Sequence, residues 1–309
     1  MNNRITTLLG NEVFLSDGGL ETDMFFNKGI DLPHMAAFTL YDMQGGKQIL
    51  DAYYTDYLKL ALRYRVNFIL ETPTWRCNKD WGAKLGYTPA DLDKINRIAV
   101  EHMKSLRQAF ETDSTHIIIS GNIGPRGDGY TPTDMLNVVE AESYHSNQIA
   151  TFKNAGVDLV SAFTMNYLDE ALGIVNAAKK MEVPVVISFT LEIDGRLPDG
   201  GTFENAIETA DRTTGSYPLY YMVNCAHPLH FKNKLGSLET LKRVKGLRAN
   251  SSTKSHEELD NSVEIDKGDM DLLAREYLDL RNSLPALSVI GGCCGTDHTH
   301  IARICETIL

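Results

Sequence analysis

The sequence lacks several features that mark whole classes of protein. Its net charge is −11, so it has no excess of positive charge for binding nucleic acid or an anionic membrane. No apolar run approaches the ~20 residues of a membrane-spanning helix. The apolar stretch within residues 1–10 is too short for a secretory signal. We therefore expect no nucleic-acid partner, no membrane partner and a cytoplasmic location.

Two further absences bear on the chemistry. No Gly-x-Gly-x-x-Gly sequence follows the first strand-like segment, so a dinucleotide-binding site loses its main support. Five cysteines in 309 residues do not resemble the disulfide framework of a small secreted domain. The cysteines therefore point to metal binding or catalysis.

The order of strand-like and helix-like segments predicts the fold. Eight segments read as strands: 13–16, 66–71, 116–121, 157–162, 183–189, 219–224, 244–248 and 287–290. Segments long enough for a helix lie between most of them, such as 46–64, 89–110, 143–154 and 168–181. Repeated βα units imply a parallel sheet, and eight units fit a closed barrel better than an open sheet of about five or six strands. We predict an α/β fold, a single (β/α)8 TIM barrel domain over residues 1–309.

Barrel enzymes carry their active sites at the C-terminal ends of the strands. The residues expected there are Asp17-Gly18-Gly19, Glu71-Thr72-Pro73, Asn122-Ile123-Gly124-Pro125, Thr164-Met165-Asn166, Thr190-Leu191-Glu192, Cys225, Asn250-Ser251-Ser252 and Cys293-Cys294. Two long loops, 194–202 and 250–258, have the length of substrate lids.

Three cysteines at two of these strand ends give the strongest chemical signal. Cys225 follows one strand, and Cys293 and Cys294 stand in Gly291-Gly292-Cys293-Cys294-Gly295-Thr296. Adjacent residues of a regular strand point to opposite faces, but the flanking glycines permit other backbone conformations. Three thiolates leave one open position on zinc, where a substrate thiol would lose its proton and become nucleophilic near neutral pH.

These motifs resemble those of the homocysteine S-methyltransferase family. The resemblance rests on Asp17-Gly18-Gly19, Asn224-Cys225 and Gly291-Gly292-Cys293-Cys294-Gly295-Thr296, in matching order and spacing over nearly the whole chain. It implies a barrel that holds Zn²⁺ through Cys225, Cys293 and Cys294, which are its metal-binding and catalytic residues. It also implies methylation of L-homocysteine to methionine, and so a place in methionine biosynthesis.

The methyl donor differs among members of that family. Donors include S-methylmethionine, S-adenosylmethionine, betaines and a methylated folate-linked cobalamin. We expect a small onium donor, with S-methylmethionine or S-adenosylmethionine favoured, because 309 residues include no additional folate or cobalamin module. The expected partners are therefore a small-molecule thiol and a methyl donor.

Eight residues are candidates for substrate binding: Asp17, Gly18, Gly19, Glu21, Thr72, Thr164, Glu192 and Asn224. Asp17 matches the acidic residue of the family's first loop, and its carboxylate is suited to a substrate ammonium. The chain departs from the family at Ala162-Phe163-Thr164, because Phe163 stands where members commonly have a glutamate that contacts the amino acid. Either Glu192, Glu71 or Glu21 supplies the missing carboxylate, or the thiol is not homocysteine.

Other residues have weaker claims to function. An aromatic cage for an onium donor is one interpretation of Trp75, Trp81, Phe25, Phe26 and Tyr87. His227 is a candidate for a spare metal ligand or for a partner of a ligand, since it follows Cys225 by two residues.

Three further residues have little claim. His298 and His300 would not share a helical face, so metal ligation by them is not expected. Cys305 falls on an apolar helical stripe and is expected in the core.

Two alternative functions remain at the sequence level. A phosphate-binding barrel is one, although no lysine stands at a strand end and the cysteines would have no role. The other is a closed structural or storage zinc site, with a fourth ligand such as His227 and no catalysis. Binding of an exogenous thiol at the fourth position would distinguish catalysis from storage.

Overall fold

The computed structural model describes residues 3–262 and 264–309 of the chain. The strands are β1 (Phe14–Leu15), β2 (Asn67–Glu71), β3 (Ile117–Ile123), β4 (Leu159–Met165), β5 (Val185–Thr190), β6 (Tyr221–Asn224), β7 (Val244–Ala249) and β8 (Val289–Gly292). The α-helices are α1 (Asn3–Leu9), α2 (Leu20–Thr22), α3 (Gly46–Tyr64), α4 (Lys79–Lys84), α5 (Pro89–Phe110), α6 (Val138–Ala155), α7 (Leu168–Lys180), α8 (Phe203–Thr214), α9 (Pro228–Phe231), α10 (Leu238–Leu241), α11 (His256–Asp260), α12 (Met270–Ser283) and α13 (His298–Ile308). Three short helices of other types, η1 (Asp23–Asn27), η2 (Pro33–Met35) and η3 (Ala37–Tyr41), lie between α2 and α3.

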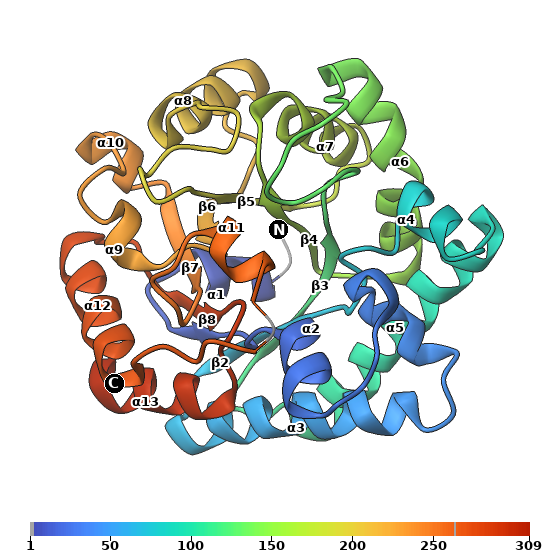
Figure 1. Ribbon diagram of the computed structural model, residues 1–309, viewed down its shortest axis with the longest axis horizontal. Coiled ribbons are helices and arrows are strands. Elements are labelled where there is room, and N and C mark those ends of the chain that lie inside the picture. Colours follow the sequence, from blue (N-terminus) through green and yellow to red (C-terminus); the bar gives the residue numbers. More distant parts are fainter. Residues whose placement is uncertain (1–2, 263) are drawn as a thin grey trace.

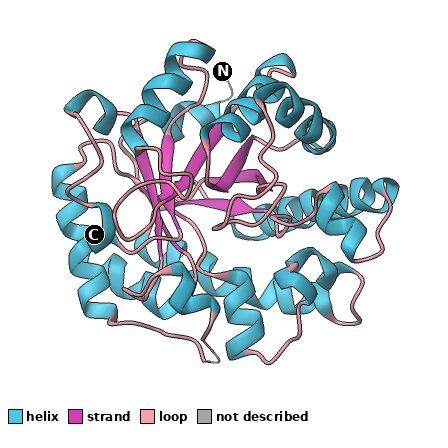
Figure 2. Ribbon diagram, turned by 45° about the horizontal axis from the view of Figure 1, so that its top comes forward, coloured by secondary structure: helices cyan, strands magenta, loops and turns pink. Residues whose placement is uncertain are grey.

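The strands form a closed barrel in sequence order, from β1 to β8. All neighbouring strands are parallel, and Phe14 of β1 pairs with Asn67 of β2 and with Val289 of β8. The helices form a ring around the strands, as Figures 1 and 2 show. The predicted (β/α)8 barrel is confirmed.

Apolar side chains fill the barrel from its amino-terminal end. Ile5 and Leu8 of α1 pack into one buried cluster with strand residues such as Phe14, Ile69 and Val289. This cluster closes the amino-terminal end of the barrel, whereas the larger buried core lies between the strands and the surrounding helices. The C-terminal ends of the strands are left for polar residues. No helix among the described residues is both long and apolar enough to cross a membrane.

The helices show how closely local sequence signals fix element bounds. α3 and α5 begin and end at the predicted residues. α6 begins five residues before the predicted start, because Asn137 caps it and Glu140 returns a hydrogen bond to the cap. The predicted strands are each found within a few residues of their expected bounds.

One strand carries an irregularity that shapes the site. The pairing of β4 with β5 shifts between Ala162 and Met165, which is a β-bulge at Phe163 and Thr164. Thr164 has a φ of 62°, in the left-handed region that residues with a Cβ rarely adopt. A regular strand would send these two side chains to opposite faces, whereas here both line the same pocket.

Candidate functional site

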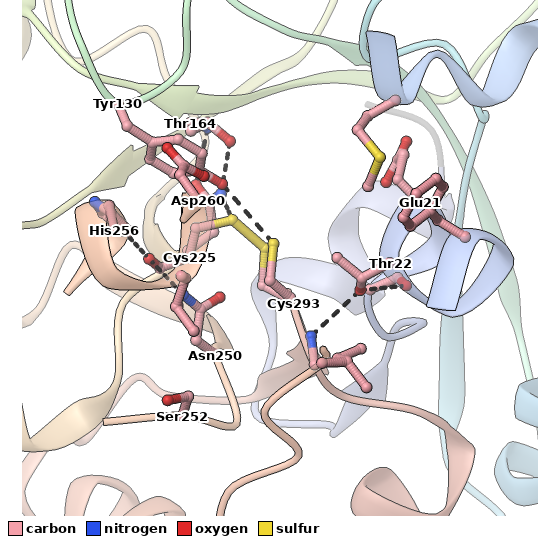
Figure 3. A pocket seen from close by; sticks show the side chains of 18 of the residues that line it. Glu21, Thr22, Tyr130, Thr164, Cys225, Asn250, Ser252, His256, Asp260 and Cys293 are labelled. Carbon is pink, nitrogen blue, oxygen red and sulfur yellow. Dashed lines mark hydrogen bonds between the residues drawn. A yellow bond between two sulfur atoms is a disulfide. The ribbon is translucent and has the colours of Figure 1, made fainter. Parts of the chain in front are cut away.

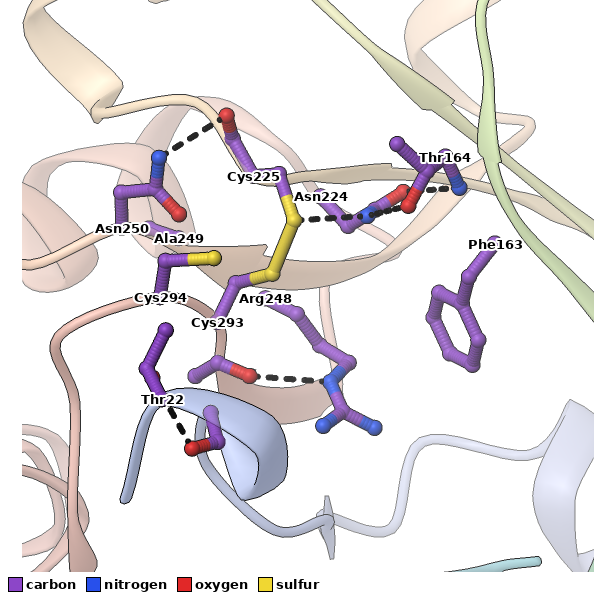
Figure 4. The surroundings of a disulfide bond; sticks show 12 residues. Thr22, Phe163, Thr164, Asn224, Cys225, Arg248, Ala249, Asn250, Cys293 and Cys294 are labelled. Atoms are coloured by element: carbon purple, nitrogen blue, oxygen red, sulfur yellow. Dashed lines mark hydrogen bonds between the residues drawn. A yellow bond between two sulfur atoms is a disulfide. The ribbon is translucent and has the colours of Figure 1, made fainter. Parts of the chain in front are cut away.

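Three cysteines meet at the C-terminal end of the barrel. Cys225 follows β6, and Cys293 and Cys294 follow β8. Their sulfur atoms all lie within 4.8 Å of one another, and no other group of three such residues that could hold a metal occurs in the described part of the chain. Cys225 and Cys293 are joined by a disulfide, whereas Cys294 has a free thiol (Figure 4).

The backbone around the cysteines explains how adjacent residues reach one site. β8 ends at Gly292, so Cys293 and Cys294 lie beyond the regular strand. The Cys293 amide donates to the carbonyl of Ala249 on β7, at 2.8 Å. Gly295 then turns the chain with a φ of 78°, and Cys225 itself has a φ of 54°. Both loops therefore use left-handed backbone to direct sulfur atoms toward a common point.

The donor set fits a thiophilic metal ion such as zinc. Zinc binds cysteine sulfur readily, and three such ligands leave one of its four coordination positions open. In the form shown here, two of the three sulfurs are bonded to each other, so they become available as ligands only when the disulfide is reduced. Metal ligation by Cys225, Cys293 and Cys294 stays a prediction.

The surroundings of Cys294 disfavour a thiolate unless a cation is present. The pKa of the Cys294 thiol is raised to about 11, mainly by burial and in part by the carboxylates of Glu21 and Asp260, against the opposing hydrogen bond with Tyr130. A nucleophilic cysteine needs the opposite, an electropositive setting that lowers its pKa. A metal ion would supply the positive charge that the protein does not provide.

Asn224 connects the cysteine cluster to the neighbouring strands. Its Nδ2 donates to the sulfur of Cys225 at 3.2 Å and to Oγ1 of Thr164 at 2.9 Å. Its Oδ1 accepts from the Thr164 amide at 2.9 Å and from Oγ of Ser188 at 2.7 Å. Every polar atom of this amide is thus used, which fixes the ends of β4, β5 and β6 relative to one another.

A cavity of about 340 Å³ opens beside the three cysteines (Figure 3). Among the predicted residues, Gly18, Gly19, Glu21, Thr164 and Asn224 line it together with the cysteines. The predicted lid 250–258 lines the cavity through Asn250, Ser252 and His256, and Asp260 just beyond it also contributes. The other predicted lid, 194–202, does not line it.

A buried guanidinium organises the inner wall of this cavity. Arg248, at the C-terminal end of β7, forms an ion pair with Asp17 at 2.8 Å. It also donates to the carbonyl of Gly292 at 3.0 Å and to that of Gly18 at 2.9 Å. The ring of Phe163 lies 5.0 Å from the guanidinium carbon. Arg248 therefore ties the first loop to the loop that carries the cysteines.

Two buried carboxyls share the charge of Arg248. Asp17 is 3% exposed and also accepts from the hydroxyl of Tyr53 at 3.0 Å. Burial raises the pKa of Asp17 even so, and it raises the pKa of Glu71 to about 7. Glu71 accepts a hydrogen bond from Ser161 at 3.1 Å. Neither residue lines the cavity, so the Asp17 carboxylate is engaged inside the barrel and not at the cavity wall.

Three glutamates were candidates to take over the role of the family glutamate that Phe163 replaces, and only one of them reaches the cavity. Glu71 is enclosed in the barrel, and Glu192 bonds Nδ1 of His256 at 3.1 Å without lining the main cavity. Glu21 alone among the three lines it. Burial raises the pKa of Glu21 to about 7, with a further contribution from Asp17.

The remaining predicted contact residues have different positions. Gly18 and Gly19 line the cavity, and the Gly19 amide donates to the carbonyl of Thr296 at 3.2 Å. Thr72 is 1% exposed and does not line the cavity, because its hydroxyl bonds that of Thr74 at 2.7 Å and accepts from the Asn122 amide at 2.9 Å.

The five aromatic residues proposed for an onium cage do not all come together. Phe25, Phe26 and Trp75 line the cavity, whereas Trp81 and Tyr87 do not. The sequence alone could not separate the two groups, since the cavity takes these aromatic residues from the short helix η1 and from the loop after β2.

The three histidines considered from the sequence, His227, His298 and His300, are not part of the cysteine cluster. His227 caps α9 by accepting from the Leu229 amide at 3.3 Å, and burial lowers its pKa to about 4. Neither His298 nor His300 belongs to a possible metal group among the described residues. Cys305 is fully buried in the core, which confirms its prediction.

Sequence reasoning missed two residues that contact the cysteines. The Tyr130 hydroxyl lies 3.8 Å from the sulfur of Cys294, and its ring packs 4.3 Å from that of His256. Nε2 of His256 lies 2.5 Å from the carbonyl oxygen of Cys225. His256 did fall within the predicted lid, but the position of Tyr130 depends on a loop conformation that no local pattern reveals.

The sequence matches the model of one protein family, homocysteine S-methyltransferase, over residues 14–308. No curated protein matches the chain.

Solved structures of the homocysteine methyltransferase MmuM from Escherichia coli share the fold. The metallated form is 19% identical, with a TM-score of 0.72 and coverage of 97% of this chain and 98% of that one. The oxidized form is also 19% identical, with a TM-score of 0.75 and coverage of 98% and 99%. The apo form is 17% identical, with a TM-score of 0.64 and coverage of 98% of each chain.

Proposed function

The chain belongs to the homocysteine S-methyltransferase family, and on that premise we propose that it transfers a methyl group from a small onium donor to L-homocysteine, giving methionine. S-methylmethionine and S-adenosylmethionine are the donors we favour, and Zn²⁺ is the proposed cofactor. One barrel domain spanning residues 1–309 would carry the whole site.

The observation that carries this proposal is the convergence of three sulfur atoms on one wall of a cavity of about 340 Å³. Cys225, Cys293 and Cys294 are the proposed metal ligands. When bound, zinc lowers the pKa of a coordinated thiol so that the sulfur reacts as a thiolate near neutral pH. Asn224 supports this ligand set, since its amide fixes the sulfur of Cys225.

The chain's own residues would orient the substrates. We assign to Glu21 the contact with the homocysteine ammonium, because it lines the cavity and Phe163 has no charge to offer. Gly18, Gly19 and Thr164 shape the wall nearby, and Asp17 holds the first loop through Arg248. Alignment of sulfur, methyl carbon and leaving group then accounts for catalysis without a dedicated general base.

A second candidate is methyl transfer to a different thiol. Phe163 favours it, since an apolar ring replaces a carboxylate beside the cavity. A thiol without an ammonium group would need no carboxylate at the position of Phe163, and Glu21 would then have no partner in the substrate.

Zinc K-edge X-ray absorption tests the proposal on reduced, anaerobic protein with and without L-homocysteine. Three Zn–S bonds of about 2.3 Å that become four on addition support metal-assisted thiol activation. A zinc-loaded sample that does not change would remove homocysteine as the thiol and favour the second candidate. A closed four-ligand site before addition would instead indicate a structural or storage metal.

A further inference from the structure

Arg76 stands at the wall of the same cavity in an unusual setting. It follows Trp75 in the loop after β2 and lines the cavity. Its guanidinium carbon lies 4.7 Å from the ring centre of Trp75 and 3.9 Å from that of Trp81. Two indole rings therefore hold the cation in place, which limits the entropy that it would lose on binding a ligand.

Arg76 is a cation without a partner. No hydrogen bond or ion pair joins it to another described residue, and its buried Nε lacks an acceptor. The other basic side chains around the cavity have carboxylate partners: Arg248 pairs with Asp17, and His256 contacts Glu192. A buried donor without an acceptor is costly, so the site favours a ligand that supplies one.

The cavity also offers carboxylates for a positive group. Glu21 and Asp260 line it, and neither forms an ion pair with a described residue. Both act electrostatically on Arg76, as does Asp128. The wall thus presents one fixed guanidinium close to unpaired carboxylates, which is complementary to a ligand that carries both charges.

We propose that Arg76 binds the carboxylate of a zwitterionic substrate and so selects against substrates that lack one. This inference rests on the proposed function. A planar guanidinium binds a carboxylate through two parallel hydrogen bonds, which a lysine or an amide does not reproduce. Both proposed substrates carry a carboxylate, so it comes either from the thiol or from the methyl donor, and the ammonium or sulfonium group lies toward Glu21 and Asp260.

The chain provides a reporter for this contact that does not depend on turnover. Trp75 and Trp81 are its two tryptophans, and both contact Arg76. A ligand that binds the guanidinium should therefore change the tryptophan fluorescence of the zinc-loaded protein. Lys84 offers a matched control, because its Nζ lies 3.8 Å from the Trp81 ring but it does not line the cavity.

The experiment titrates wild type, Arg76→Gln, Arg76→Lys and Lys84→Gln with four probes. These are L-homocysteine, S-methyl-L-methionine and the analogue of each without its carboxylate, 3-aminopropane-1-thiol and (3-aminopropyl)dimethylsulfonium. Steady-state KM and kcat are measured for the same compounds. We expect Arg76→Gln to weaken binding and raise KM about tenfold or more for one carboxylate-bearing substrate, with partial rescue in Arg76→Lys.

Comparing each substrate with its analogue shows whether Arg76 recognises a carboxylate. The analogue without a carboxylate should bind wild type and Arg76→Gln equally, and Lys84→Gln should match wild type throughout. The substrate that binds Arg76→Gln more weakly than wild type is the one whose carboxylate contacts Arg76. Binding without methyl transfer in wild type would reject the proposed function and keep the role of Arg76. Three results would overturn the inference. Arg76→Gln could turn over both substrates with unchanged KM, or it could lose as much affinity for an analogue as for its carboxylate-bearing parent. The third is that no probe binds to wild type.

Discussion

Cys294 is the residue that best distinguishes metal binding from cysteine catalysis. It has a free thiol beside the bonded pair, and its pKa is raised to about 11 by burial, with Glu21 and Asp260 adding to the effect. A nucleophilic cysteine in such a setting would be protonated at neutral pH. As the third ligand of a metal, the same sulfur would be deprotonated by the ion itself.

Replacing Cys294 with alanine should therefore abolish both zinc binding and turnover. Two sulfur ligands with no third make a poor zinc site. Zinc content measured by mass spectrometry and methionine formation give the two readouts. Cys77→Ala is the control: Cys77 is buried in a separate apolar cluster and does not line the cavity, so this variant should keep its zinc. A Cys294→Ala protein with full zinc and activity would refute the assignment.

Glu21→Gln should raise KM for L-homocysteine about tenfold while the zinc content stays unchanged. The amide keeps the shape of the side chain but removes the charge that attracts an ammonium group. Glu257→Gln is the matched control, because Glu257 is exposed on α11 and does not line the cavity. Equal KM values in wild type and Glu21→Gln would show that another group, or another thiol, fills this part of the site.

Single residues differ in how far the sequence could locate them. The cysteines could be found because Cys293 and Cys294 are adjacent and flanked by glycines, and because Cys225 follows a predicted strand. Arg248 could not, since its importance depends on Asp17, which comes from a distant segment. Arg76 could not either, because its two tryptophans are near in sequence but its place at the cavity wall depends on how the loops fold. Thr72 was placed at the correct strand end but faces a neighbouring threonine instead of the cavity.

At the scale of the elements, the ends of β4, β5 and β6 act as one unit through Asn224. Its amide joins Thr164 on β4, Ser188 on β5 and the sulfur of Cys225 after β6. The alternation of strands and helices was predictable from hydrophobic runs. The bulge at Phe163 was not, because a bulge is set by the pairing of β4 with β5 and has no separate local signal.

Asn224→Ala should weaken zinc binding by about 10- to 100-fold, a loss typical of residues that support metal ligands. The cysteines would remain, but the sulfur of Cys225 and the bulged backbone at Thr164 would lose their shared anchor. Zinc affinity by chelator competition measures the effect. Ser188→Ala removes only one of these bonds and should cause a smaller loss. Equal effects of the two substitutions would contradict the anchoring role.

At the scale of the whole molecule, barrel closure brings together thiols that are far apart in sequence. Cys225 and Cys293 are 68 residues apart and meet because β6 and β8 are separated by a single strand. The same proximity permits either a shared metal or a disulfide. The two states exclude each other, since a disulfide leaves no thiolates on those residues.

Oxidised protein should therefore contain three free thiols and no zinc, whereas reduced protein should contain five thiols and bind one zinc ion. Thiol titration under denaturing conditions, together with zinc analysis, measures both quantities on the same sample. A sample with three thiols and a full equivalent of zinc would place the metal elsewhere in the molecule.

The stability of the whole barrel should depend on pH through Glu71, which lies among buried groups that join β1, β2 and β7. Burial raises its pKa from 4.5 to about 7, although Arg248 opposes the shift. Below pH 4.5 the carboxyl is protonated in both the folded and the unfolded chain, so it has no effect. Between pH 4.5 and 7 only the unfolded chain ionises and gains free energy, so the free energy of unfolding falls as pH rises. Above pH 7 the penalty is constant.

Glu71→Gln should remove that penalty, because the amide does not ionise. From pH 5 to pH 8 the variant should gain roughly 2 to 3 kcal/mol of stability relative to wild type, as the size of the pKa shift implies. Denaturant unfolding of the reduced protein at the two pH values gives this difference directly. Glu208→Gln, at an exposed position of α8, should show no such change. A difference between Glu71→Gln and wild type that is the same at both pH values would mean that Glu71 ionises normally and that Arg248 compensates its charge in full.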